Sequence, residues 1–210
     1  MYTLYYYPLN ASMAPHFVLE HLSCNFKLEL VDRKNNAQKS EDYLKLNPLG
    51  KIPVLIDDGK AMFESPAICL HLADKHPESN LAPELASPER ATFYQWLMYL
   101  TNTLQAELMI YFYPERHCSQ DAELTKDTQE ERIANMFTVL DKELEGKNFL
   151  VGNKVSICDY YLFMLSIWAD EIKKPPLSFS NLNRYLKSMA KLGAVVRACN
   201  TEGFSLSDYK

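Results

Sequence analysis

The sequence predicts two domains, an α/β domain with a mixed four-stranded sheet and an all-helical domain that follows it. Short β-rich runs alternate with helical patterns up to about residue 76, and apolar residues at helical spacing dominate from residue 88 onward. Between these regions, residues 77–87 contain two prolines and no apolar period, which is typical of a linker. We therefore assign the domains to residues 1–76 and 88–210 of the 210-residue chain.

The first half of the α/β domain is predicted to be a β-α-β unit. Residues 2–6 form a β-rich run that stops before Pro8. A helix is expected from residue 12 to 22, with Pro15 in its first turn, where the missing N–H costs nothing. Residues 26–30 alternate apolar and charged side chains, as in a strand with one buried face.

The second half of the domain is predicted to add two antiparallel strands and a helix. Residues 52–56 form a strand that carries Pro53; we expect this proline at the strand's start or edge, with its preceding bond a candidate for the cis form. A tight-turn signal at residues 57–60 predicts that residues 61–63 return antiparallel. Ser65 is expected to cap a helix that starts with Pro66 and runs to about Lys75.

Five helical segments are expected in the second domain. A long helix starts near residue 87, and a second amphipathic pattern covers residues 133–144. Ser156 and Asp159 have the spacing of a capping box at the start of a third helix. Residues 181–191, and a further segment at 194–200, complete the helical domain.

Composition and charge exclude several classes of partner. Lys and Arg number 22 against 27 Asp and Glu, and this net charge of -5 offers no general attraction to nucleic acid or to anionic membranes. The five cysteines are scattered without a C-x-x-C pair, which suits reduced thiols in a cytoplasm. We find no signal-peptide pattern and no apolar run of about 18 residues, so we expect a cytoplasmic protein without a membrane partner.

Self-contained catalytic motifs are lacking in the sequence. It contains no glycine-rich nucleotide loop, no H-E-x-x-H and no G-x-S-x-G. The five histidines lack metal-ligand spacing, so we expect no metal.

Two motifs carry a family resemblance. Residues 47–55 (NPLGKIPVL) and 64–68 (ESPAI), with SICD at 156–159 in the helical domain, resemble the cytosolic glutathione transferases over nearly the whole chain. Residues 4–8 (LYYYP) and 12–16 (SMAPH) most resemble the bacterial beta class. The resemblance implies a thioredoxin-like first domain, a homodimer with a role in detoxification, glutathione as co-substrate and a hydrophobic electrophile as second substrate.

The resemblance also implies roles for the motif residues, which agree with the chemistry of an acidic tripeptide. Ser65 at a helix N-terminus would bind the γ-glutamyl carboxylate, and Glu64, or an acid of a partner subunit, would bind the ammonium group. With a cis bond before Pro53, the backbone of Ile52 would pair with the cysteinyl residue as a short strand addition. Lys51 would meet the glycine carboxylate.

The catalytic task is to hold the glutathione thiol as a thiolate. Lowering its pKa by two units requires about 2.7 kcal/mol, and one charge-assisted hydrogen bond supplies about 1.5–3 kcal/mol. A single hydroxyl donor is therefore enough, and the sequence offers two: Ser12, which we place first, and Tyr6.

Three positions depart from the beta class. Ala11 stands where that class carries its cysteine, which excludes mixed-disulfide chemistry with glutathione there. Gln105 stands about where the class has a histidine, and Asn36 lies near its usual lysine. We predict a glutathione transferase, with isomerisation and peroxide reduction left open as reactions; the alternative is a non-catalytic interaction or regulatory protein that keeps the fold.

Overall fold

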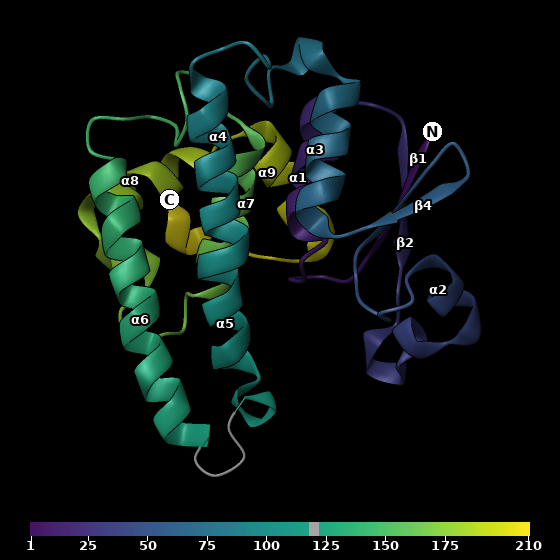
Figure 1. Ribbon diagram of the computed structural model, residues 1–210, viewed down its shortest axis with the longest axis horizontal. Helices are drawn as coiled ribbons and strands as arrows, with labels where there is room; N and C mark the ends of the chain where they lie inside the picture. The colour runs from purple at the N-terminus through teal and green to yellow at the C-terminus, as the bar shows by residue number, and fades with distance from the viewer. Residues whose placement is uncertain (118–121) are drawn as a thin grey trace. The chain divides into compact units, whose positions relative to one another are not determined.

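The computed structural model describes residues 1–117 and 122–210 (Figure 1). The chain forms two compact units. The first unit contains residues 1–82, 190–208 and Lys210, so both ends of the chain contribute to it. The second unit contains residues 83–189 and Tyr209. The sequence-based division at residues 76 and 88 stays a prediction.

The first unit is built on the predicted four-stranded mixed sheet. The strands are β1 (Tyr2–Tyr6), β2 (Phe26–Leu30), β3 (Val54–Asp57) and β4 (Lys60–Phe63). Their order across the sheet is β2-β1-β3-β4, with β1 parallel to β2 and the other two pairs antiparallel. The predicted thioredoxin-like order of elements is thereby confirmed.

Four helices belong to this unit: α1 (Met13–Leu22), α2 (Glu41–Leu46), α3 (Ser65–Lys75) and α9 (Gly193–Glu202). Helix α1 packs against both α3 and α9, as Figure 1 shows. Apolar side chains of α1 and α3, with Leu4 of β1, are fully buried in this core. A helix from the far end of the chain is therefore part of the first unit's packing.

The turn and proline signals in the sequence are confirmed. Asp58 and Gly59 both have positive φ, at 48° and 76°, as a two-residue hairpin turn requires. Strand β3 starts directly after Pro53, and the Ile52–Pro53 bond is cis. The expected one-sided burial of residues 26–30 is wrong at Leu30, which is 58% exposed because it ends a strand at the edge of the sheet.

The predicted start of α3 is wrong by one residue. Glu64, with φ 73° and ψ 109°, is the N-cap, and Ser65 is already the first helical residue. Pro66 lies in the first turn, where its missing N–H leaves no hydrogen bond unmade. The Ser65 side chain therefore does not cap the helix; its hydroxyl donates to the Ala11 carbonyl instead.

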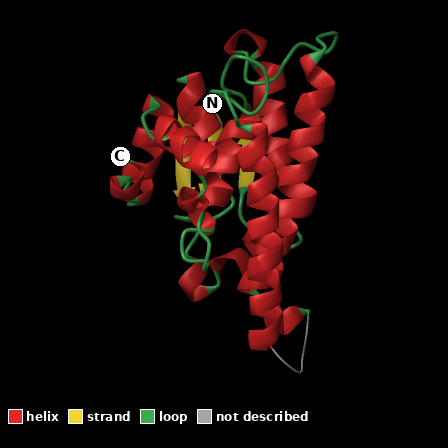
Figure 2. Cartoon of the chain, turned by 90° about the vertical axis from the view of Figure 1, so that its left-hand side faces the viewer, coloured by secondary structure: helices red, strands yellow, loops and turns green. Residues whose placement is uncertain are grey.

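The second unit is helical, with no strand among its described residues (Figure 2). A π-helical turn, η4 (Tyr99–Leu104), lies between α4 (Glu89–Met98) and α5 (Gln105–Phe112), so the predicted long helix is continuous but not regular. The other helices are α6 (Ala122–Glu143), α7 (Ile157–Trp168) and α8 (Ser180–Met189). No helix in the described part of the chain has the length and apolarity needed to span a membrane.

Asp159 organises the start of α7, and the predicted capping box is confirmed. One carboxylate oxygen accepts from the Ser156 N–H at 2.7 Å and from its hydroxyl at 2.9 Å. The other accepts from the Leu150 N–H and the Tyr185 hydroxyl, both at 2.8 Å. A single buried carboxylate thus joins a helix start, the preceding loop and α8.

Candidate functional site

Three connections meet at one end of the sheet in the first unit. Val54, at the start of β3, pairs with Tyr5 near the end of β1 and with Phe63 at the end of β4. The segments after β1, before β3 and after β4 therefore emerge at the same end of the sheet. The Ser65 hydroxyl joins two of them by donating to the Ala11 carbonyl at 2.7 Å.

These connections contain all the residues that the sequence singled out for the first unit. Tyr6 and Ser12 lie at the two ends of the segment that follows β1. Lys51, Ile52 and Pro53 directly precede β3, and Glu64 and Ser65 directly follow β4. The structure thus brings the predicted site residues to one end of the sheet, and their roles stay predictions.

The start of α3 offers donors for an anion. The first N–H groups of a helix have no partner within it, and the helix dipole adds positive potential there. Ser65 is buried, and the single proton of its hydroxyl is used on Ala11. An anion at this helix start would therefore be held by backbone N–H groups and not by the Ser65 hydroxyl. Glu64 is exposed, with backbone in the left-handed region that non-glycine residues rarely adopt.

The two candidate hydroxyl donors differ in their surroundings. Ser12 is fully buried; its hydroxyl donates to the Tyr7 carbonyl at 3.1 Å and accepts from the Tyr7 N–H at 3.3 Å. The Tyr6 ring lies edge-on to His16, with centroids 6.3 Å apart. The Tyr6 hydroxyl has no hydrogen-bond partner among residues 1–117 and 122–210. Only Tyr6 therefore has a proton that no internal acceptor uses.

The segment between β1 and α1 is anchored from the other end of the chain. Glu202, the last residue of α9, accepts from the Leu9 N–H at 3.0 Å, and its other oxygen lies 2.8 Å from Nδ1 of His16. The side chains of His16 and Glu202 are fully buried. Leu9 has φ 56°, a costly conformation for a branched side chain, and this hydrogen bond helps to hold it.

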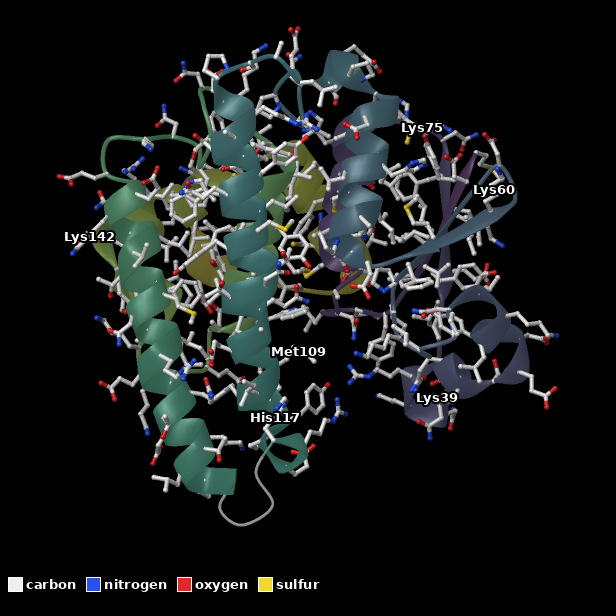
Figure 3. All side chains as sticks on the ribbon, viewed as in Figure 1. Lys39, Lys60, Lys75, Met109, His117 and Lys142 are labelled. Carbon is white, nitrogen blue, oxygen red and sulfur yellow. The ribbon has the colours of Figure 1, made fainter. Side chains whose placement is uncertain are left out.

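The segment before β3 is equally fixed. The Lys51 side chain is exposed, but its carbonyl accepts from the Tyr43 hydroxyl at 2.9 Å and from Nδ2 of Asn47 at 2.7 Å. Gly50 has φ 57°, and an added Cβ would lie 2.7 Å from Nζ of Lys39, the residue labelled in Figure 3. A side chain at position 50 would therefore be strained and would displace that lysine.

The three departures from the beta class have distinct surroundings. Ala11 supplies the carbonyl that receives the Ser65 hydroxyl. Asn36 is exposed, with φ 58°. Gln105, in the second unit, accepts a hydrogen bond from the buried Tyr161 hydroxyl at 2.6 Å. The amide of Gln105 is thereby oriented within the helical unit.

The described part of the chain offers no metal cluster and no reactive thiol at the site. None of its His, Cys, Asp or Glu residues form a group of three suited to a metal. Burial raises the pKa of the Cys24 and Cys69 thiols, and burial together with Glu202 raises that of Cys199 to about 12. Cys158 is buried in the helical unit. As far as the described cysteines go, a nucleophilic sulfur at the site would therefore have to come with a ligand.

Four residues that hold the site were not predicted for it. His16 and Glu202 are 186 positions apart, and no local pattern connects them. Asn47 is the first residue of the NPLGKIPVL motif, and Tyr43 lies shortly before it. Their closeness to the predicted site residues Lys51 and Ile52 could have indicated a role in the site. Within that motif, only Lys51, Ile52 and Pro53 were predicted to belong to the site.

Family models match both parts of the chain. Residues 1–74 match the glutathione S-transferase N-terminal domain, and residues 101–192 match the glutathione S-transferase C-terminal domain.

The similar relatives and solved structures are also glutathione S-transferases. Glutathione S-transferase GST-4.5 of Xanthomonas campestris is 29% identical over 204 residues, covering 96% of this chain and 99% of its own. Glutathione S-transferase F10 of Arabidopsis thaliana is 32% identical, covering 73% of this chain and 74% of its own. A sphingomonad glutathione S-transferase complexed with glutathione is 30% identical with a TM-score of 0.84, covering 97% of this chain and 100% of its own.

Replacing the buried carboxylate that anchors the Leu9 turn should destabilise the protein. We expect Glu202→Ala to lower the free energy of unfolding by about 2–4 kcal/mol, because the Leu9 N–H and the buried His16 both lose their partner. Glu202→Gln should cost much less, since its amide can donate to Nδ1 of His16 while its oxygen accepts from Leu9. Denaturant unfolding measures both.

The matched control lies on the same helix. Arg197 of α9 pairs with Glu20 at a half-exposed position, so Arg197→Ala should change the free energy of unfolding by less than about 1 kcal/mol. Equal losses for Glu202→Ala and Arg197→Ala would contradict the anchoring role of Glu202.

Proposed function

Because the chain belongs to the glutathione S-transferase family, we propose that it binds glutathione at the end of the sheet around Val54 and activates its thiol for attack on a hydrophobic electrophile. The observation that carries the proposal is the meeting of three connections there, with Ser65 and Ala11 joined directly. This end of the sheet offers the N-terminus of α3, the exposed carboxylate of Glu64 and the unpaired backbone before β3. These are the groups that an acidic tripeptide with an ammonium group needs.

Each end of glutathione has a partner of suitable chemistry. The N–H groups at the start of α3 bind the γ-glutamyl carboxylate, and Glu64 takes the ammonium group. The Ile52 backbone pairs with the cysteinyl residue, since Pro53 ends the ladder there. The exposed Lys51 ammonium pairs with the glycine carboxylate.

The thiolate is stabilised at the start of α1 by the helix dipole and by one hydroxyl. Tyr6 is the donor that the surroundings support, because its proton has no acceptor in the described chain. Ser12, the first candidate predicted from the sequence, would have to give up its hydrogen bond to the Tyr7 carbonyl. Removal of a thiol proton by a neighbouring base is not needed when one donor lowers the pKa enough.

Cellular role and location follow from the family and from the cysteines. We infer a cytoplasmic enzyme of detoxification. The four described cysteines, Cys24, Cys69, Cys158 and Cys199, form no disulfide with one another, which agrees with a reducing compartment.

We also propose that the protein is a homodimer, through a face of the second unit. A groove of about 300 Å³ there is lined by Tyr99, Arg132, Asn135, Met136 and Val139. Tyr94 and Met98, four residues apart on α4, are large apolar side chains left 42% and 43% exposed. A second copy could cover such a face with two-fold symmetry, because both partners then bury the same apolar surface.

Glutathione binding and conjugation test the proposed activity directly. Titration calorimetry should detect glutathione with a Kd in the range of about 1 μM to 1 mM, and a chloronitroaromatic electrophile should be conjugated. A γ-glutamyl-alanyl-glycine peptide, which lacks the thiol, should bind without supporting turnover. Absence of glutathione binding, with capture of a stable protein partner, would instead select the non-catalytic interaction protein.

The identity of the hydroxyl donor is tested by the pH dependence of the conjugation rate. Tyr6→Phe should raise the pH of half-maximal rate towards 8.5, because loss of a donor to the anion raises the pKa of the bound thiol. Below that pH the rate should fall about tenfold per pH unit, as the thiolate fraction does.

The second variant separates the two candidates. Ser12→Ala should leave the pH midpoint in place and lower the free energy of unfolding by about 1–2 kcal/mol, because its hydroxyl bridges the Tyr7 backbone. A shifted midpoint in Ser12→Ala with an unchanged one in Tyr6→Phe would assign the donor role to Ser12.

Sedimentation tests the homodimer. The 24.2 kDa chain should sediment at twice that mass, and Val139→Lys should shift it to the monomer, because a second cation would be buried in the groove that Arg132 already lines. Leu124→Lys is the matched control: it lies on the same helix, is 63% exposed and is absent from the groove lining. A wild-type monomer would refute the dimer.

A further inference from the structure

We propose that Tyr43 and Asn47 are positioning residues that hold the Lys51–Ile52 peptide group so that the Ile52 N–H is aimed at the cysteinyl carbonyl of glutathione. The inference rests on the proposed function and deepens it. Neither side chain touches the ligand in this proposal, and both act through one carbonyl oxygen.

The Lys51 carbonyl is saturated by two side-chain donors. The Tyr43 hydroxyl lies 2.9 Å from this oxygen and the Asn47 amide nitrogen lies 2.7 Å from it. A carbonyl oxygen has two lone pairs, so these two donors use its full accepting capacity. The oxygen is therefore held away from any ligand.

Holding this carbonyl also fixes the N–H of Ile52, because the two groups belong to the same planar peptide unit. The Lys51–Ile52 bond is trans, since among the described residues only Ile52–Pro53 is cis, and in a trans unit the C=O and N–H point in opposite directions. The paired register of β1 and β3 ends at Val54. Within the described ranges, 1–117 and 122–210, nothing accepts from the Ile52 N–H, so it is left for a ligand.

The first donor, Tyr43, is rigid. It lies in α2 and is buried in a cluster with Val31, Ile52 and Val54. Its ring meets the Tyr5 ring edge to face, with centroids 5.9 Å apart. Burial raises the pKa of the Tyr43 hydroxyl well above its usual value, so it stays protonated and able to donate.

The second donor, Asn47, is fixed at both ends of its amide. Its Oδ1 accepts from the Leu49 N–H at 3.0 Å, and its Nδ2 donates to Lys51. Since one partner can only donate and the other can only accept, the orientation of the amide is determined. The Asn47 N–H also donates to the Tyr43 carbonyl at 2.9 Å, so the two donors are tied to each other.

Two consequences for binding follow. A peptide group that is already oriented loses little freedom when glutathione binds, so more of the hydrogen-bond energy appears as affinity. Two donors on its carbonyl also polarise the peptide and strengthen its N–H as a donor. Loss of either side-chain donor should weaken glutathione binding while leaving the chemistry of the bound thiol unchanged.

Titration calorimetry and steady-state kinetics test the inference on three variants of the full chain. Tyr43→Phe and Asn47→Ala should each raise the Kd and KM for glutathione about fivefold, the effect of one ordinary hydrogen bond. The kcat at saturating glutathione should stay within about twofold. Tyr5→Phe is the matched control, because it removes a hydroxyl from the same aromatic pair without touching Lys51, and its KM should not change.

An analogue separates positioning from general loosening of the fold. In this analogue a methylene replaces the cysteinyl carbonyl, so it cannot accept from Ile52. Wild type should bind it more weakly than glutathione, and Tyr43→Phe should bind it as wild type does. Equal weakening of both ligands in Tyr43→Phe, or unchanged glutathione binding in both variants, would overturn the inference.

The outcomes also distinguish this inference from the proposed function. If the wild-type protein binds no glutathione, the proposed function fails, and the positioning role fails with it. If wild type binds and the variants bind equally well, only the positioning role fails. Should Asn47→Ala not fold, the isosteric Tyr43→Phe and the analogue decide the question alone.

Discussion

The site depends on one constraint, the double pairing of Val54 within the sheet. This buried residue faces Tyr5 on one side and Phe63 on the other, so it fixes the ends of β1, β3 and β4 relative to one another. A shift of one residue in either pairing would turn the neighbouring side chains to the opposite face of the sheet. The three connections that form the candidate glutathione site lie at the same end of the sheet only because this register holds.

Each of these connections is then held by buried polar groups from elsewhere in the chain. Glu202 holds the Leu9 turn, Ser65 holds the Ala11 carbonyl, and Asn47 with Tyr43 holds the Lys51 carbonyl. In every case a backbone group receives a side-chain partner. Loops fixed in this way need little rearrangement on binding, and a ligand with several weak contacts gains affinity from that order.

The chemistry follows from what the site lacks as well as from what it holds. Ala11 removes a protein thiol from the start of α1, and burial raises the pKa of the thiols of Cys24, Cys69 and Cys199. The sulfur of glutathione is then the nucleophile, and in the proposed mechanism the protein supplies a helix dipole and one hydroxyl proton. This division of roles suits conjugation to an electrophile better than disulfide exchange with the protein.

The sequence by itself determined the features that depend on neighbours along the chain. Strand β1, the turn at Asp58 and Gly59, the start of β3 after Pro53 and the capping box at Asp159 were all predicted, because each depends on local backbone preferences. The family motifs also predicted which segments would form the candidate site, and the strand pairing brings these segments to one end of the sheet. Even locally the prediction had a limit: Ser65 became the first helical residue, one position past the predicted cap.

Only the tertiary structure decided which atoms in those segments are available. The proton of Ser12 is used by Tyr7, that of Ser65 is used by Ala11, and that of Tyr6 has no acceptor in the described chain. Helix α9 joins the first unit and brings Glu202 to His16 across 186 positions. Partners so far apart in sequence leave no periodic or local signal, because their contact arises from packing of the folded chain rather than from the backbone preferences of either segment.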